Sequence, residues 1–264
     1  MTSGAGGRSR RSGAETSGSG DILRTLELLW NTGPRPSRGP RPGLTLDRIV
    51  EAAVRIADAE GIEAVSMRRV AAELGTGAMS LYRYVPGKAE LLDLMLDRVQ
   101  EETLELAEAE QDGDGWRAAV EAMAHAYLAH YRRHPWLLRV NQARTVLGPS
   151  SLRSLEASLG PLQGMGLSDP ELISLIIAVQ SFTGGIARME LDAHEAAKET
   201  GLSHEEFWGK QEPFLTQAMG SGRYPMLAAL SEDTFTEDFD HFDFGLQRLL
   251  DGLEVLVARR TGDS

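Results

Sequence analysis

Apolar positions along most of the chain repeat with the period of an α-helix. From residue 44 onward they recur three or four positions apart, and a Ser, Thr or Asp precedes several runs in the place of a helix N-cap. This pattern predicts helices at 45–61, 67–74 and 78–84, then a long helix that begins at Lys88. An apolar phrase at 21–31 predicts a further short helix, which either packs on the following domain or docks on another protein. The expected fold class is therefore all-α.

The second half of the chain continues in the same manner. Residues 112–264 predict helices at 116–133, 136–147, 150–164, 170–199 and 239–260. Asp169 is the expected N-cap of the fourth, with Pro170 in its first turn. The start of that helix and the final helix carry more apolar surface than one amphipathic helix needs to bury. Either the rest of the chain or a partner must cover this surface.

The first 43 residues differ in composition. Residues 1–20 hold six Gly, five Ser and three Arg and offer almost nothing to bury, which predicts disorder. Residues 34–43 are rich in proline and favour polyproline II, in which Arg35, Arg38 and Arg41 fall on one edge. That edge is either part of a stiff solvated linker or an arm that enters the minor groove of DNA.

Composition excludes several classes of protein. The chain of 264 residues contains no cysteine, so disulfide scaffolds, thiol catalysis and cysteine-ligated metals are excluded, and a cytoplasmic location fits. The first 20 residues lack the apolar segment of a secretory signal. The longest uncharged apolar stretch, 172–187, is 16 residues long and contains several polar side chains, which is too short and too polar for a membrane span. We expect a soluble protein with no membrane partner.

Charge is distributed unevenly. The net charge is −12, but residues 1–100 carry 14 Lys and Arg against 12 Asp and Glu, whereas residues 101–264 carry 13 against 27. Phosphate binding depends on the local field, so the acidic total does not exclude nucleic acid. The expected organisation is an extension at 1–43 with a short helix at 21–31, a mildly basic domain at 44–100 and an acidic body at 101–264.

The basic domain contains the pattern of a helix-turn-helix. Two of its helices are joined by a short turn that contains glycine. The helix after the turn has Leu81 as its main apolar anchor, and it carries many hydrogen-bonding groups for its length: Ser80, Tyr82, Arg83 and Tyr84. A helix that reads DNA needs such groups, whereas a core helix does not.

This domain resembles the helix-turn-helix of TetR-type regulators over about residues 44–100. The residues that carry the resemblance are Gly61, Val65–Ala71, Leu74–Gly75, Ser80–Val85, Lys88 and Glu90–Leu92. Met79–Val85 and the later Phe244–Leu246 are most similar to the tetracycline-repressor-like subgroup. The resemblance implies an all-helical homodimer, in which three N-terminal helices bind DNA and a larger helical body binds a small effector.

The resemblance also implies which residues contact DNA: Ser66, Arg68, Ala78, Met79, Ser80, Tyr82, Arg83, Tyr84 and Lys88. We expect Arg68 and Arg83 to read guanine, and Lys88 to bind a phosphate at a helix N-terminus. Tyr82 either faces DNA or packs half-buried, and Arg69 is expected on a solvated face.

The sequence departs from the family pattern in the turn. Thr76–Gly77 stands where many members have a branched apolar residue followed by Ser or Thr, and Ala78 is too short to hydrogen-bond a base edge. Specificity is therefore expected to depend on arginine and on the shape of the DNA.

In the body, the family forms its dimer from the last two long helices of each subunit. The matching positions here are Leu172, Leu175, Ile176, Val179, Leu246, Leu249, Leu250, Leu253 and Leu256. The alternative is that these residues belong to the core of a single chain. An effector pocket is mostly apolar with a few polar groups. Candidates for its lining are Trp136, Gln142, Arg144, Met165, Gln180, Phe182, Thr183 and Met189. The polar members Gln180 and Thr183 equally fit hydrogen bonds across a dimer interface.

Metal binding and catalysis have little support. His130 and His134 share a helix face, but Pro135 ends that helix and no carboxylate lies four residues away, so interaction with the helix dipole is the preferred interpretation. The chain has no Gly-rich phosphate loop, no His-Glu-x-x-His and no Gly-x-Ser-x-Gly. We expect neither an enzyme nor a cofactor.

These observations favour a ligand-responsive transcriptional repressor that binds a palindromic operator in double-stranded DNA as a homodimer. The alternative is a DNA-binding regulator without a small-molecule effector, controlled by a partner or architectural in role. A helical protein that only binds or transforms small molecules is the third possibility.

Overall fold

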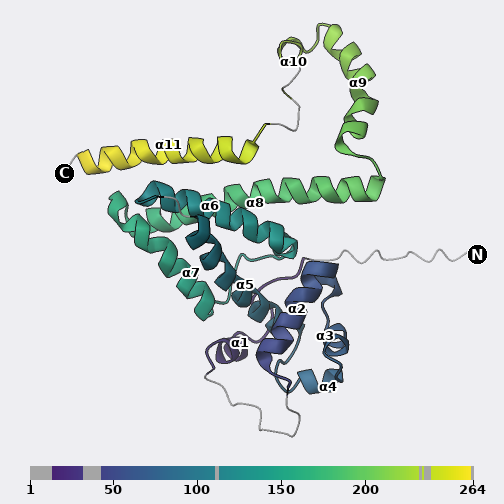
Figure 1. The fold of residues 1–264 in the computed structure, drawn as a ribbon, viewed down its shortest axis with the longest axis vertical. Coiled ribbons are helices and arrows are strands. Elements are labelled where there is room, and N and C mark those ends of the chain that lie inside the picture. Colours follow the sequence, from purple (N-terminus) through teal and green to yellow (C-terminus); the bar gives the residue numbers. More distant parts are fainter. Residues whose placement is uncertain (1–13, 32–42, 111–112, 232–233, 235–238, 263–264) are drawn as a thin grey trace, which may run out of the picture. The chain divides into compact units, whose positions relative to one another are not determined.

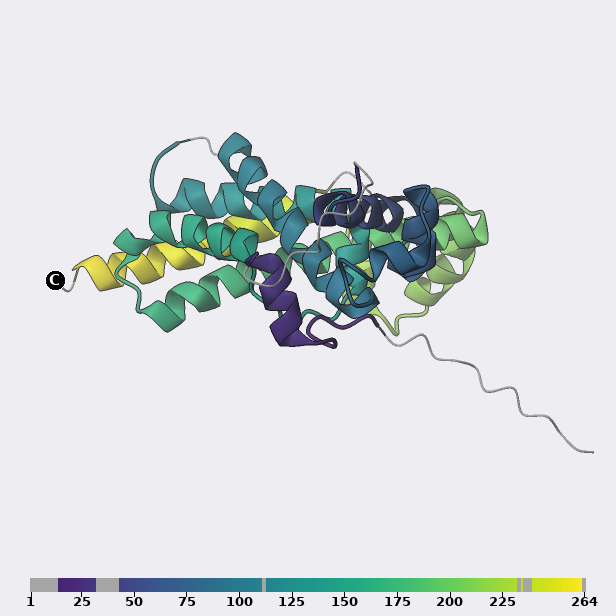
Figure 2. The same cartoon turned by 90° about the horizontal axis from the view of Figure 1, so that it is seen from below.

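The computed structural model describes residues 14–31, 43–110, 113–231, 234 and 239–262 (Figure 1). These residues form helices and no strand, as predicted, and one isolated bridge joins Thr16 and Asn141. The α-helices are α1 (Ile22–Leu29), α2 (Leu46–Glu60), α3 (Met67–Glu73), α4 (Ala78–Leu81), α5 (Lys88–Glu110), α6 (Trp116–Arg133), α7 (Pro149–Leu159), α8 (Asp169–Thr200), α9 (His204–Gly220), α10 (Pro225–Ala228) and α11 (His241–Gly262). Short 3-10 helices lie at Ile62–Ala64, Pro135–Arg139 and Gly160–Met165. Figure 2 gives the view from below.

The described residues fall into two compact units. The first comprises those up to residue 105 together with 130–157, and the second comprises 106–129 together with those from 158 onward. Helices α5, α6 and α7 each contribute to both units. The division differs from the expected boundary at residue 100, because the segment 130–157 belongs with the N-terminal helices.

The first unit contains the helix-turn-helix. Thr45 and Ser66 cap α2 and α3 by accepting hydrogen bonds from backbone N–H groups at 3.2 and 3.1 Å, which confirms both predicted caps. Gly75 adopts a φ of 62° in the turn, a conformation that side chains with a Cβ disfavour. Helix α4 ends at Leu81, three residues earlier than predicted. After Leu81 the chain forms a turn instead, in which the N–H groups of Tyr84 and Val85 donate to the Leu81 carbonyl at 2.8 and 3.0 Å.

The N-terminal segment is an ordered part of this unit from residue 14 onward, which corrects the prediction of disorder over 14–20. Asp93 on α5 accepts hydrogen bonds from the Ser17 hydroxyl at 2.7 Å and from the Gly18 N–H at 3.0 Å. Helix α1 forms as predicted, and Leu29 joins the buried core of the unit. Helix α1 therefore packs on the domain that follows it, which was one of the two roles predicted for this helix. The predicted polyproline II segment at 34–43 lies outside the described residues except for residue 43.

One face of α5 carries buried carboxylates that hold other segments. Glu90, Asp93 and Asp97 are all buried, and each accepts hydrogen bonds from backbone N–H groups elsewhere in the unit. Asp97 receives the N–H and hydroxyl of Ser151 at 2.9 and 2.8 Å, at the start of α7. Burial raises the pKa of Asp93, against the opposing effect of its hydrogen bonds. Sequence periodicity alone does not distinguish such buried carboxylates from a solvated face.

The predicted helix at 136–147 is absent. After α6 the chain forms one 3-10 turn and then runs extended, and Asn141 exchanges backbone hydrogen bonds with Glu15 and Ser17 at 2.8 and 3.1 Å. The indole N–H of Trp30 also donates to the Leu147 carbonyl at 3.3 Å. The N-terminal segment thus satisfies backbone groups that a helix would otherwise pair internally.

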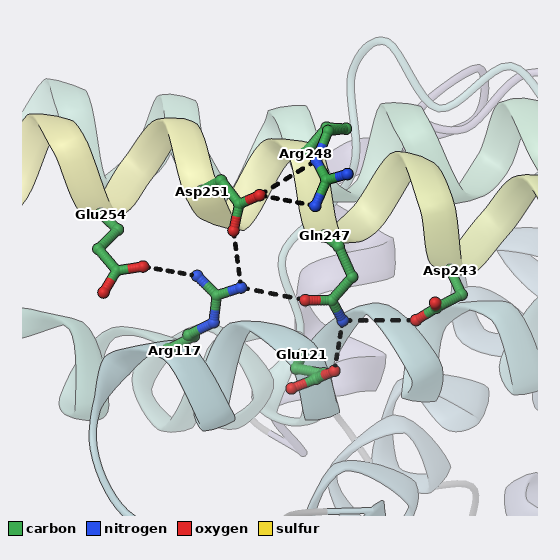
Figure 3. A network of polar contacts seen from close by, with 7 residues as sticks. All are labelled: Arg117, Glu121, Asp243, Gln247, Arg248, Asp251 and Glu254. Carbon is green, nitrogen blue, oxygen red and sulfur yellow. Dashed lines mark hydrogen bonds and ion pairs between the residues drawn. The ribbon is translucent and has the colours of Figure 1, made fainter.

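In the second unit, polar contacts link α6 to α11 (Figure 3). The guanidinium of Arg117 donates to Gln247, Asp251 and Glu254 at 3.0–3.1 Å. Gln247 in turn donates to Glu121 at 2.8 Å. Hydrogen bonds from Arg117 lower the pKa of Asp251.

Helices α8 and α11 pack together in the second unit. Added at Gly245, a Cβ would lie 2.6 Å from the Phe182 ring, so glycine permits the close approach of the two helices. Ser168, rather than the predicted Asp169, caps α8, and its backbone N–H donates to Glu171 at 2.8 Å. Helix α9 was not predicted, although Ser203 and Glu206 form a capping box at its start. Figure 1 shows α9 and α10 beyond the C-terminal end of α8.

Helix α8 is 32 residues long and contains an 18-residue window apolar enough to cross a membrane by length and composition. The uncharged part of α8, residues 172–187, is 16 residues long. Within the unit, α8 buries Leu172, Leu175, Ile176, Val179, Thr183 and Ala187. These residues form one buried face of α8, and the expectation of no membrane partner stays a prediction.

Candidate nucleic-acid interface

The helix-turn-helix exposes a compact set of the side chains that were expected to contact DNA. Met79 and Tyr82 have relative exposures of 78% and 47%, although both are large and partly apolar. Arg68 on α3 and Arg83 just after α4 are exposed as well. Neither arginine forms an ion pair with any described residue, so both guanidinium groups are available to an incoming anion.

Other expected contact residues have roles inside the protein. The Ser66 hydroxyl accepts the N–H of Arg69, so it already caps α3. Tyr84 is half-buried and packs against the core of the unit. Ala78 and Ser80 are both half-buried, so these two present only part of their surface.

Arg69 differs from its neighbour Arg68. Its guanidinium pairs with Glu60 at 2.6 Å and with Glu73 at 2.9 Å, and these hydrogen bonds raise its pKa. The neutralised side chain fits the expectation that Arg69 lies on a solvated face.

Lys88 has a partner that the sequence did not indicate. Its ammonium lies 2.7 Å from a carboxylate oxygen of Glu15, and 3.4 Å from the Ile62 carbonyl. Glu15 comes from the segment that was expected to be disordered, so no local pattern pointed to the pair. A phosphate at the N-terminus of α5 must therefore compete with Glu15 for the lysine.

The proposed minor-groove arm, Arg35, Arg38 and Arg41, lies outside the described residues. The elements on either side of it, α1 and α2, both belong to the first unit.

The eight candidate pocket residues divide between the two units. Trp136, Gln142 and Arg144 belong to the first unit, where Trp136 is buried and its indole N–H donates to Asp58 at 2.8 Å. The others, Met165, Gln180, Phe182, Thr183 and Met189, belong to the second. Of these, Met165 and Thr183 are buried and Met189 is 65% exposed.

Among the described residues, no group of three or more His, Asp or Glu side chains is placed to hold a metal ion. His134 instead hydrogen-bonds the carboxylates of Asp58 and Glu102, at 2.7 and 3.1 Å. These carboxylates come from α2 and α5, so a search for carboxylates at helical spacing could not find them.

Two family models match the chain. The model of bacterial regulatory proteins of the tetR family covers residues 49–95, and the tetracyclin repressor-like C-terminal domain covers residues 108–257. The chain belongs to the TetR family. As a TetR-family member it is a DNA-binding transcriptional repressor and not an enzyme, in agreement with the sequence prediction.

Relatives within the TetR family are similar over most of the chain. The HTH-type transcriptional repressor DrrR1 of Streptomyces coeruleorubidus is 64% identical over 264 residues, which cover 100% of this chain and 97% of DrrR1. The structure of ActR from Streptomyces coelicolor in complex with actinorhodin has a TM-score of 0.62 and 30% identity, covering 81% of this chain and 96% of that one. A possible TetR family regulator from Streptomyces coelicolor A3(2) has a TM-score of 0.59 and 30% identity, with coverages of 80% and 100%.

The ion pair between Glu15 and Lys88 leads to a prediction for this TetR-family regulator. Glu15→Gln removes the carboxylate that competes with DNA phosphate, so affinity for duplex DNA should rise by roughly 1.5- to fivefold, the range of a partly exposed ion pair. The Lys88–phosphate contact should also make binding more sensitive to salt. Titrations of duplex DNA at several salt concentrations measure both effects.

Glu63→Gln is the matched control, because Glu63 is an exposed carboxylate of the same unit that pairs with no lysine or arginine among the described residues. Equal affinities for the two variants would show that net charge, rather than the release of Lys88, accounts for any gain.

Proposed function

We propose that this protein is a ligand-released repressor that acts in the cytoplasm and binds a palindromic DNA operator as a homodimer. The observation that carries the DNA-binding part is the pair of exposed arginines, Arg68 and Arg83, beside Tyr82. They remain free of carboxylate partners among the described residues of a chain whose net charge is −12. Arginine is the side chain that most often reads guanine in the major groove.

A homodimer provides two such reading surfaces for two half-sites. Six of the nine expected interface residues are already buried within one chain, and they form its core: Leu172, Leu175, Ile176, Val179, Leu246 and Leu250. Five of the apolar side chains that remain accessible on α8 and α11 lie at helical spacing: Ile173, Ile177, Leu249, Leu253 and Leu256. We assign the dimer interface to this second set, because a partner can cover it without disturbing the core.

The interface predicts the effect of one charge. Ile177→Glu places a carboxylate where a second subunit would bury it, so the variant should be a monomer at concentrations where the wild type is a dimer. Ala193→Glu adds the same charge at an exposed position nearer the C-terminal end of α8 and should leave the dimer intact. Mass in solution over a dilution series measures both. A dimeric Ile177→Glu protein would move the interface elsewhere.

An effector site in the second unit is supported by an unpartnered hydroxyl. Thr183 is fully buried on α8, and its Oγ1 has no hydrogen-bond partner among the described residues. The preceding residue, Phe182, stacks on Phe242 at 5.8 Å, and His125 meets the edge of Phe242 at 5.1 Å. Buried hydroxyls without partners are costly. A ligand with a flat apolar part and one polar group would match these residues, and the ActR structure with actinorhodin gives a precedent for ligand binding in a TetR-family neighbour.

The test is selection of bound fragments from random duplex DNA by the purified protein, with its mass in solution recorded. The proposal predicts a palindromic consensus bound by a dimer, and release of the selected duplex by some members of a panel of small aromatic compounds. A consensus that no compound displaces would favour a regulator controlled without an effector. A dimer that enriches no sequence at low salt would contradict the operator-binding role.

A further inference from the structure

A charged cluster ties α2 of the helix-turn-helix to α5 and to the end of α6. The His134 ring is 2% exposed. Its Nδ1 lies 2.7 Å from Asp58 on α2, and its Nε2 lies 3.1 Å from Glu102 on α5. All three residues belong to the first unit.

The geometry determines the charge of the ring. Both partners are carboxylates, which accept hydrogen bonds when ionised and cannot donate. Both ring nitrogens must therefore donate, and only the imidazolium form carries a proton on each. A neutral ring would satisfy one carboxylate and direct a lone pair at the other.

The neighbours of the cluster balance its charge. Arg133 pairs with Glu102 at 3.0 Å, and the indole N–H of Trp136 donates to the same Asp58 oxygen as His134. With His134 protonated, the two cations and two carboxylates cancel. Another titratable neighbour is His130 on α6, whose ring centroid lies 5.2 Å from that of His134.

The two histidines titrate in opposite directions. Burial lowers the pKa of His134, but hydrogen bonds and charge from Asp58 and Glu102 outweigh it, so the net pKa is raised above 6.5. For His130, burial and the positive charges of His134 and Arg133 lower the pKa to about 3. His130 is therefore the neutral member of the pair.

We propose that His134 is a positioning residue for DNA binding. Its imidazolium holds α2 of the helix-turn-helix domain against α5 and the end of α6. This inference rests on the proposed DNA-binding function and adds a control of it by pH. Deprotonation breaks one of the two hydrogen bonds, which loosens α2 and requires the domain to be reordered when it binds DNA. Affinity for DNA then falls as pH rises.

The sign of the stability effect follows from the same titration. A histidine whose pKa rises on folding contributes stability that is complete below about 6.5 and is lost as pH rises through the folded value. His130 acts in the other window, because its lowered pKa costs stability as pH falls from about 6.5 toward 3. Of these two effects, only the loss of stability at rising pH is due to His134.

The experiment uses the full chain and two measurements. The first follows the His134 ring by NMR and the free energy of unfolding by denaturant between pH 5 and about 9. The second measures affinity for the duplex selected by the wild type at about pH 6 over the same range. We expect wild-type affinity to fall roughly threefold or more across the His134 titration. A tenfold change in affinity corresponds to one unit of pKa difference between free and DNA-bound protein, so threefold corresponds to about half a unit.

Three variants separate this role from a merely structural one. His134→Gln should remove the alkaline loss of both stability and affinity. Asp58→Asn keeps the His134 ring and a side-chain oxygen that can accept from Trp136, but it removes one negative charge beside the ring. The midpoint of the His134 titration should therefore move to lower pH. His194→Gln removes an exposed histidine of α8 and should keep the wild-type profile.

A wild-type pH profile in His134→Gln, or an NMR titration that finds the His134 ring neutral at about pH 6, would overturn the proposal. So would an Asp58→Asn midpoint equal to that of the wild type. If the wild type selects no duplex at any pH, the DNA-binding proposal fails by itself. The titration and unfolding data still decide whether the imidazolium links α2 to α5.

Discussion

Arg83→Ala should weaken binding to the selected operator by about 1–3 kcal/mol, which is roughly five- to 150-fold in affinity. Arg83 is exposed directly after α4 and pairs with no described carboxylate, so its guanidinium reaches DNA without first breaking an ion pair in the protein. A bidentate contact to guanine contributes discrimination as well as affinity. Preference at one base pair of each half-site should therefore relax, and competition with single-base operator variants measures it.

Arg69→Ala is the matched control for that result. Arg69 carries the same charge in the same unit, but Glu60 and Glu73 already neutralise it. Its removal should leave base preference unchanged and affinity within about twofold. A wild-type base preference in Arg83→Ala, or an equal loss in Arg69→Ala, would remove Arg83 from base reading.

Leu81→Ala should cost about 2–5 kcal/mol of unfolding free energy, the range for a leucine truncated in a well-packed core. Leu81 is fully buried and is the only buried residue of α4, so the placement of the recognition helix depends on it. Met79→Ala, two positions earlier on the same helix, removes a side chain that is 78% exposed and should change stability by no more than about 0.5 kcal/mol. Denaturant unfolding of the two variants provides the comparison.

The two variants should also separate in DNA binding. Met79→Ala removes a contact from a folded surface, so its affinity should fall without loss of stability. Similar unfolding free energies for both variants would mean that α4 is held by its flanking turns rather than by Leu81.

Local signals in the sequence predicted much of the fold. The capping residues Asp21, Thr45 and Ser66 act within one turn of helix, and α6 begins and ends where the apolar period predicted. The segment after Pro135 could not be predicted in the same way. Its backbone pairs with Glu15 and Ser17, more than 100 positions away, and helical periodicity contains no information about such partners.

The candidate interface shows the same limit. The exposed arginines followed from the resemblance to a family, because residue type and spacing carry that pattern. The competition between Glu15 and DNA for Lys88 depends on a long-range fold contact. The hydrogen bonds of His134 to Asp58 and Glu102 also depend on long-range fold contacts, since they join α2, α5 and the end of α6.

The row of buried carboxylates on α5 has a practical consequence for work with fragments of this protein. A truncated chain that begins at the helix-turn-helix would retain Glu90 and Asp93 but lose the N–H and hydroxyl donors of residues 17–21 that now satisfy them. Both carboxylates would then lose these donors, and the side of α5 that the segment now covers would be open to solvent. A minimal DNA-binding fragment should therefore begin before Glu15, and a fusion partner joined close to that point would need a spacer that leaves this segment free to dock.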